Sequence, residues 1–125
     1  MIFDTDILIW IQRGNEKAAA LIQKVQERYI SVQTYMEFLQ CAESKIQLQY
    51  AKNFFSDFDF QILPLTQNIG HRAAIYIEEY SLGTGIRAGD AIVAATATEN
   101  NKELCTGNKK HFRQIKDLKL KIFQC

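Results

Sequence analysis

The stretch DAIVAATAT, residues 90–98, decides the fold class of this chain. After the leading aspartate, every residue is apolar or a threonine, so a helix formed here has almost no polar face to turn toward water. Such a helix is stable only when other elements cover it, and in an α/β domain the covering layer is a β-sheet. We therefore expect residues 90–100 to form a buried helix that packs on a sheet.

The rest of the chain supplies strands and further helices in alternation. Short segments rich in β-branched and aromatic residues predict strands, and longer segments with apolar residues three, four and seven apart predict helices. The predicted strands are residues 1–3, 29–32, 60–65, 104–106 and 120–123, and the predicted helices are 7–11, 16–28, 34–42, 46–58, 66–82 and 90–100, with a loop at 83–85. This alternation indicates an α/β fold with a mostly parallel sheet covered on both faces.

Length and composition favour one globular domain over residues 1–125, with 47% hydrophobic and 23% charged residues. No apolar run approaches the roughly 18 residues of a membrane span. The start, with acids at Asp4 and Asp6, does not resemble a secretory signal. The three cysteines are an odd number without C-x-x-C spacing, which argues against a disulfide scaffold or a zinc site. We expect a cytoplasmic protein with reduced thiols and no membrane partner.

The formal net charge of +1 conceals an uneven distribution of charge along the chain. Residues 1–101 hold 8 basic and 12 acidic side chains, a net of −4, whereas residues 102–125 hold 7 basic and 2 acidic side chains, a net of +5. A basic segment beside an acidic body suggests contact with phosphate, although a solvated tail would show the same pattern. Lys109, Lys110 and Arg113 are the candidate phosphate contacts.

Three carboxylates fall where a parallel sheet gathers its ligands, beyond the carboxyl ends of the strands. Asp4 follows the first predicted strand, Glu37 lies early in the helix after the second, and Asp90 opens the buried helix. Two of them have an alternative, purely local role, because Asp90 can cap its helix and Glu37 can form a capping box with Thr34. A convergent set of carboxylates, however, repels itself unless a cation joins it. Oxygen ligands of this kind favour Mg²⁺ or Mn²⁺, the ions that assist phosphodiester cleavage.

Four stretches resemble, in order and at normal spacing, the motifs of PIN-domain proteins, especially the VapC-type ribonuclease toxins. DTDILI (residues 4–9) looks like their opening motif, and SVQTYME (residues 31–37) is similar to the second, a strand that runs into a glutamate-bearing helix. RAGDAIVAATA (residues 87–97) closely resembles the third motif, and TGNKKHF (residues 106–112) resembles the fourth, which ends in a phenylalanine. The resemblance spans the whole chain.

The resemblance implies a three-layer α/β/α fold with a sheet of four to five strands. It also implies a Mg²⁺- or Mn²⁺-dependent endoribonuclease that cleaves structured RNA, such as transfer or ribosomal RNA. By analogy, Asp4, Glu37 and Asp90 would hold the metal ion and form the catalytic site. Family members are usually homodimers and act as the toxin of a type II toxin–antitoxin pair, in which a cognate antitoxin occludes the site.

The fourth motif departs from the family pattern, because many relatives carry an aspartate where this chain has Asn108. An amide can still bind a metal ion through its oxygen, but it adds no charge, so one ion is favoured over two. Asp6 stands where relatives often have asparagine, and it either assists the metal ion or caps the first helix. Thr106 is expected to hydrogen-bond Asp4 or a metal-bound water. The alternative is that it is present only because threonine favours a β-strand.

Two other functions compete with the nuclease hypothesis. Asp4 and Asp6 also resemble the D-x-D pair of haloacid-dehalogenase-type phosphatases. The chain lacks the glycine expected after the second aspartate, however, and a phosphatase would leave Glu37 without a role. A non-catalytic PIN-like module that binds RNA or a protein is the second alternative, and Asn108 favours it. His111 is expected to lie on the surface, and Trp10 either stacks on a base or belongs to the core or a dimer surface.

Overall fold

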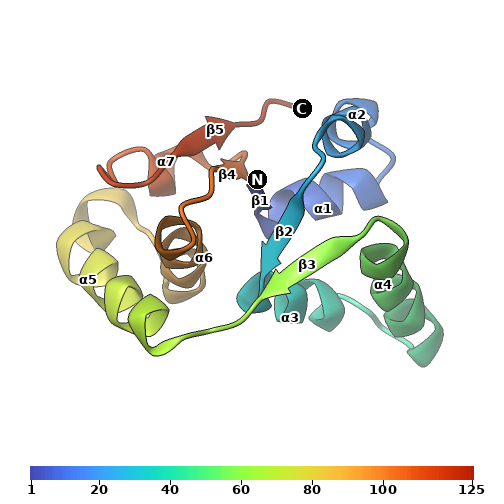
Figure 1. The fold of residues 1–125 in the computed structure, drawn as a ribbon, viewed down its shortest axis with the longest axis horizontal. Coiled ribbons are helices and arrows are strands. Elements are labelled where there is room, and N and C mark those ends of the chain that lie inside the picture. Colours follow the sequence, from blue (N-terminus) through green and yellow to red (C-terminus); the bar gives the residue numbers. More distant parts are fainter.

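A computed structural model describes all of residues 1–125 and contains a five-stranded sheet with seven helices. The strands are β1 (Ile2–Phe3), β2 (Arg28–Ser31), β3 (Phe60–Leu63), β4 (Leu104–Thr106) and β5 (Leu120–Ile122). They lie in the order β3-β2-β1-β4-β5, and every neighbouring pair is parallel. The shortest strand, at the amino end of the chain, is therefore the centre of the sheet (Figure 1).

Helices cover both faces of this sheet. The helices are α1 (Thr5–Gln12), α2 (Glu16–Lys24), α3 (Val32–Gln40), α4 (Lys45–Asp57), α5 (Gln67–Thr84), α6 (Ala88–Glu99) and α7 (Lys109–Phe112). Figure 1 shows α5 and α6 on one side of the strands, with α1 to α4 on the other. The expected α/β/α architecture with a parallel central sheet is confirmed.

The alternation of side chains along the short central strands divides the core into two clusters. Ile2 and Leu104 point into a cluster formed mainly by α5 and α6, whereas Phe3 and Cys105 point into a cluster formed by α1 to α4. Successive residues of a strand face opposite sides, so a strand of two or three residues contributes to both layers. All four side chains are fully buried, and this holds the central strands in place.

The alanine-rich helix behaves as its composition predicts. In α6, Ala91 and the whole run of residues 93–97 are buried, and α6 packs mainly against α5 and the sheet. Small side chains allow the two helices and the sheet to approach closely, because each alanine extends only one methyl group from the backbone. The expectation of a buried helix here is confirmed.

Two helix starts differ from the sequence prediction. Helix α3 begins at Val32 with Ser31 as its cap, and the Thr34 N–H donates to the Ser31 hydroxyl at 3.0 Å. Helix α1 begins at Thr5 with Asp4 as its cap, which places Asp6 inside the first turn. Predicting Thr34 and Asp6 as the caps was therefore wrong. A serine or aspartate at the end of a strand can cap the next helix directly, which leaves no loop between them.

Other boundaries shift by a few residues. The helix expected over 16–28 ends at Lys24, because Arg28 already belongs to β2, and the strand expected over 60–65 ends at Leu63 before the proline. The glycine loop expected at 83–85 is mostly helix, since α5 continues to Thr84 and only Gly85 leaves it. None of the helices combines the length and the apolarity that a membrane crossing requires.

Gly85 ends α5 in a left-handed conformation with φ of +76°, and its N–H donates to the Ser81 carbonyl at 2.9 Å. A side chain at this φ is strained, so we expect Gly85→Ala to lower the free energy of unfolding by about 1 kcal/mol. Gly70 lies in the same helix with open space around its Cα, so Gly70→Ala should raise that free energy by up to about 1 kcal/mol. Urea denaturation of both variants measures the two changes in the free energy of unfolding. Equal changes of the same sign would show that the left-handed conformation of Gly85 has no special role.

Candidate active site

Asp4 lies at the carboxyl end of the central strand β1 and is almost fully buried, with 8% of its surface exposed. Its Oδ1 accepts the N–H of Thr5 at 2.8 Å, and its Oδ2 accepts the hydroxyl of Thr106 at 2.8 Å. Burial, and then the neighbouring charge of Asp6, raise the pKa of Asp4 from 3.8 to about 7. The Thr106 contact, predicted from the sequence, is present and joins the ends of the two central strands.

Asp6 lies in the first turn of α1 and faces the loop after β4. Its Oδ2 accepts the backbone N–H of Gly107 at 2.8 Å, whereas its Oδ1 is buried without any hydrogen-bond partner. Burial raises the pKa of Asp6, although the Gly107 hydrogen bond opposes the shift. A buried carboxylate oxygen without a donor is costly, so this atom is suited to bind a proton, a water molecule or a cation.

Glu37 reaches the same edge of the sheet from α3. Its Oε1 accepts the hydroxyl of Thr5 at 3.2 Å, and burial raises its pKa. The capping box expected with Thr34 does not form, because Ser31 occupies the cap position and the carboxylate of Glu37 turns toward α1 instead. Glu37 is therefore available to the group of acids around Asp4. Nothing in the sequence marks Thr5 as its partner, since the two residues are far apart in the chain.

Asp90 lies in the first turn of α6 and contacts two segments. Its Oδ2 lies 3.4 Å from the N–H of Arg87 and 2.8 Å from Nδ1 of His111. The amide of Asn108 is also 2.8 Å from the same ring nitrogen. His111 is thus only partly exposed and holds Asp90, so predicting a surface role for it was wrong. The sequence did not indicate this role, because His111 stands among basic residues that are typical of an exposed loop.

One ring nitrogen cannot serve both neighbours in the same way, since Nδ1 either donates a hydrogen bond or accepts one. An ionised Asp90 favours the tautomer with the proton on Nδ1, which then donates to the carboxylate. The side-chain oxygen of Asn108 faces the backbone N–H of His111 instead. His111 thereby fixes the position of one oxygen of Asp90 and leaves the other free.

The four acids act on one another through space. After burial, the charge of Asp90 contributes to the raised pKa of Asp4, Asp6 and Glu37 alike. These carboxylates come from α1, α3, α6 and the end of β1, and they converge only because the strands are parallel. Their mutual repulsion is relieved by protons or by a cation.

The possible ligand atoms are all oxygens, which suits a hard divalent cation. Carboxylate and amide oxygens from Asp4, Asp6, Glu37, Asp90 and Asn108 are the ligand type of Mg²⁺ or Mn²⁺, and Asp6 Oδ1 is buried without a partner. No three acidic, histidine or cysteine side chains lie close enough to enclose one ion. Mg²⁺ commonly binds to one or two carboxylates and keeps several of its waters, so such spacing still suits it.

The candidate phosphate contacts lie beside this group. Lys109 and Lys110 form the exposed side of α7, and Arg113 follows it, also exposed. Asn108 caps α7 with its side-chain oxygen 3.4 Å from the N–H of His111, and Phe112 anchors the helix in the core. The short helix α7 was not predicted, and it places the basic side chains next to Asp90 through His111.

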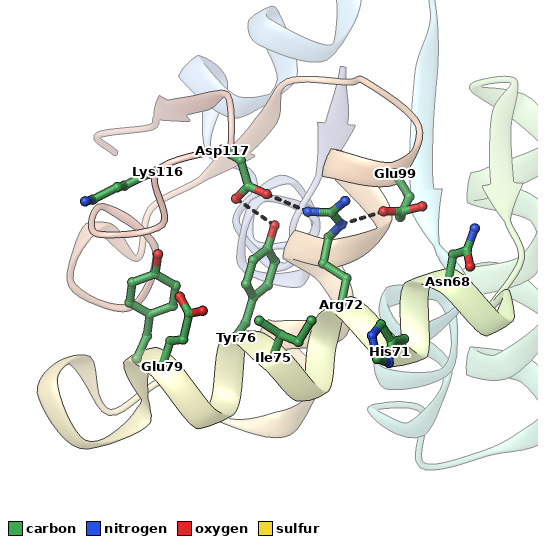
Figure 2. A pocket seen from close by; sticks show the side chains of 10 residues that line it. Asn68, His71, Arg72, Ile75, Tyr76, Glu79, Glu99, Lys116 and Asp117 are labelled. Carbon is green, nitrogen blue, oxygen red and sulfur yellow. Dashed lines mark hydrogen bonds and ion pairs between the residues drawn. The ribbon is translucent and has the colours of Figure 1, made fainter.

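A separate cavity of about 480 Å³ lies between α5, the end of α6 and residues 116–117, and it takes no residue from the acidic site. Figure 2 shows Arg72 of α5 between Glu99 and Asp117, with the hydroxyl of Tyr76 donating to Asp117. Arg72 pairs with both carboxylates, so neither acid is free to bind a ligand. The acidic edge of the sheet is therefore the better candidate site.

The fold and this edge together define an α/β domain with a carboxylate site at the end of an all-parallel sheet. The family model described as "PIN domain" matches residues 1–118, and the chain belongs to this family. The resemblance noted in the sequence is thereby confirmed. No curated protein matches the chain.

Solved structures with the same fold are similar over nearly the whole chain. A toxin–antitoxin complex from Klebsiella pneumoniae is 31% identical, with a TM-score of 0.80 over 94% of this chain and 93% of that one. VapBC2 from Rickettsia felis bound to a promoter DNA fragment is 22% identical, with a TM-score of 0.78 over 99% and 100% of the two chains. VapBC-1 from nontypeable Haemophilus influenzae is 22% identical, with a TM-score of 0.78 over 98% of each chain.

The raised pKa of Asp4 predicts how stability depends on pH without a divalent cation. Between pH 3.8 and about 7 the folded protein holds a proton that the unfolded chain has lost, so stability is greatest below this window and falls as pH rises through it. Asp4→Asn keeps the cap and the Thr106 contact but removes the charge. We expect it to raise the melting temperature at pH 8 in EDTA by at least about 5 °C.

The same comparison at pH 4 serves as the control, since there the two proteins should differ little. Adding Mn²⁺ at pH 8 should stabilise the wild-type protein more than the variant, because the cation binds to the native carboxylates. Equal melting temperatures for the two proteins in EDTA at pH 8 would show that burying Asp4 carries no cost.

Proposed function

We propose that this chain is a Mg²⁺- or Mn²⁺-dependent endoribonuclease and the toxin of a type II toxin–antitoxin pair. The observation that carries the proposal is the group of Asp4, Asp6, Glu37 and Asp90, which is buried enough to raise the pKa of the first three. Such a group is unfavourable for stability, and its natural use is to hold a cation. Membership in the PIN domain family supports the same reading.

The residues divide the work of phosphodiester hydrolysis among them. Asp4, Glu37 and Asp90 would hold the cation, some of them through its bound waters, and the cation would supply charge for the phosphate oxygens and acidify a water molecule. Thr106 keeps the carboxylate of Asp4 in one orientation, and His111 does the same for Asp90. Second partners of this kind fix the ligands and sharpen the geometry of the site.

Asn108 favours a single ion over two. It stands where many relatives carry an aspartate, and its amide faces the ring of His111 rather than presenting a charge. With Asp6 hydrogen-bonded to Gly107, the acids nearest to Asn108 already have partners at one oxygen each. One tightly held ion therefore suits this chain, with Asp6 and Asn108 as assisting ligands.

The proposed substrate is structured RNA, such as transfer or ribosomal RNA. Lys109, Lys110 and Arg113 are exposed around α7 and would contact phosphates next to the acids. Basic contacts of this type bind the backbone and weaken as salt rises. The acidic group alone would repel RNA, so the cation and the basic residues are both needed for binding.

Purified protein should cleave transfer or ribosomal RNA only when Mg²⁺ or Mn²⁺ is present. Asp4→Asn and Asp90→Asn should each lower the cleavage rate by at least about 100-fold, since each removes a charge from the metal site. Glu79→Gln, an acidic residue of the separate cavity on α5, is the matched control and should cleave normally. Gel analysis of RNA ends measures this.

The same experiment separates the alternatives. Full activity in EDTA, or in either aspartate variant, would contradict the proposed mechanism. Hydrolysis of a small phosphate monoester would favour the phosphatase alternative instead. RNA binding without any cleavage would favour a non-catalytic module, a reading consistent with the wide spacing of the acids and with Asn108.

The proposed partner is a cognate antitoxin, because the similar structures are toxin–antitoxin complexes. An apolar groove of about 410 Å³ lies between α1, α3 and α4 and offers a place for it. Its apolar lining residues are Leu8, Ile11, Phe38, Tyr50, Ala51, Phe54 and Phe58. We further propose that the chain forms a homodimer and acts in the cytoplasm, as the resemblance implies.

Tyr50 is 68% exposed in this groove, so Tyr50→Glu should place a charge on the docking surface without disturbing the core. We expect the antitoxin concentration needed for half-inhibition of RNA cleavage to rise by about tenfold or more. Asn53→Glu adds the same charge at an exposed position of α4 outside the groove and should leave inhibition unchanged. Equal inhibition of both variants would place the antitoxin elsewhere.

A further inference from the structure

An open pocket of about 550 Å³ lies between α1 and the segment that follows β5, directly beside the acidic site. Trp10 of α1 and Phe123 after β5 supply its aromatic surface. The polar lining includes Asp6, Asn108 and Gln124. The volume is in the range of sites that bind small ligands, about 300–1,000 Å³.

The pocket and the acidic site share their boundary. Asp6 and Asn108 line the pocket, and both belong to the proposed metal site. The backbone N–H of Phe123 donates to the carbonyl of Thr106 at 2.8 Å, which ties the pocket to the strand end next to Asp4. A group seated in the pocket is therefore adjacent to the position where a phosphodiester would be cleaved.

Gly107 keeps the floor between them open. A Cβ on this residue would lie 2.9 Å from Oδ2 of Asp6 and 3.5 Å from the carbonyl oxygen of Phe123. At the first distance a side chain on residue 107 would displace the carboxylate of Asp6, which the Gly107 N–H holds in place.

The chemistry of the lining favours a flat neutral group with polar edges. Asp6 is its only charged side chain, so the lining offers no positive charge to a phosphate, whereas the aromatic rings offer stacking surfaces. The amides of Asn108 and Gln124 can both donate and accept hydrogen bonds. The guanidinium of Arg13 lies 6.0 Å from the centre of the Trp10 ring. A nucleobase matches all of these features, with its phosphates outside.

We propose that this pocket receives one unpaired nucleobase of the RNA strand that is being cleaved, stacked on Trp10 and Phe123. The inference rests on the proposed ribonuclease function and adds a base-binding subsite to it. Because a base must leave its helical stack to enter, cleavage is directed to nucleotides in loops or bulges of a structured RNA. A protein side chain of the antitoxin is the other conceivable occupant, and the experiment distinguishes the two.

Trp10 is the only tryptophan of the chain, so its fluorescence reports on this pocket alone. We would titrate the Asp90→Asn variant, which should leave RNA intact, with a single-stranded hexaribonucleotide and with a matched abasic oligomer. Binding of both is followed independently by anisotropy of a labelled oligomer. We expect the base-bearing oligomer to quench the tryptophan and the abasic one to leave it unchanged.

Affinity measurements on substituted proteins supply the second readout. Trp10→Ala should weaken binding of the hexaribonucleotide by about 5- to 150-fold, the effect of losing one stacked base. Trp10→Phe keeps a stacking ring and should bind within about threefold of the parent protein, which separates stacking from folding. Leu82→Ala removes a fully exposed apolar side chain of α5 outside the pocket lining and serves as the control.

The outcomes are distinguishable. If the oligomer binds but the fluorescence stays constant and Trp10→Ala binds as the parent does, the base subsite is wrong while the ribonuclease proposal stands. If only the cognate antitoxin changes the fluorescence, the pocket belongs to the protein partner and the inference is overturned. If no RNA binds and the wild-type protein cleaves none, both proposals fail together.

Discussion

A carboxylate held out of water at the end of the central strand is the constraint on which the rest of this structure depends. Asp4 sits between the first helix and the end of β4, and its two oxygens are used by Thr5 and Thr106. These contacts hold the side chain in place but do not offset the cost of burying its charge, because its pKa remains near 7. The fold thus keeps an unfavourable group in position, as functional sites commonly do.

The surrounding acids increase that cost rather than relieve it. Asp6 and Asp90 both push the pKa of Asp4 upward, and no lysine or arginine pairs with any of the four acids. The positive charges lie beside the acids without pairing with them, on α7 and at Arg113. Separation of this kind leaves the middle for a cation and the rim for phosphates, whereas direct salt bridges would have closed the site.

Much of this arrangement could be predicted from the sequence, and the failures have physical causes. The alanine-rich stretch and the acids after strands led correctly to the layered fold, because burial and strand ends leave marks in composition and spacing. The roles of Thr5 and His111 could not be predicted, since each depends on a hydrogen bond to a residue on another element. The misplaced caps at Thr34 and Asp6 arose because each helix begins directly after its strand, with Ser31 and Asp4 as the caps. The sequence marked the carboxylates as candidates, but their distances follow only from the packing of α1, α3 and α6.

The central position of β1 has a consequence for the newly made chain. Ile2 and Phe3 pair with Leu104 and Cys105, so β1 has no neighbour on this edge until β4 has been synthesised. Asp4 likewise meets Thr106 only across 102 positions of sequence. A chain still attached to a ribosome short of residue 106 therefore lacks an assembled site. The proposed ribonuclease activity therefore cannot arise before β4 has been synthesised.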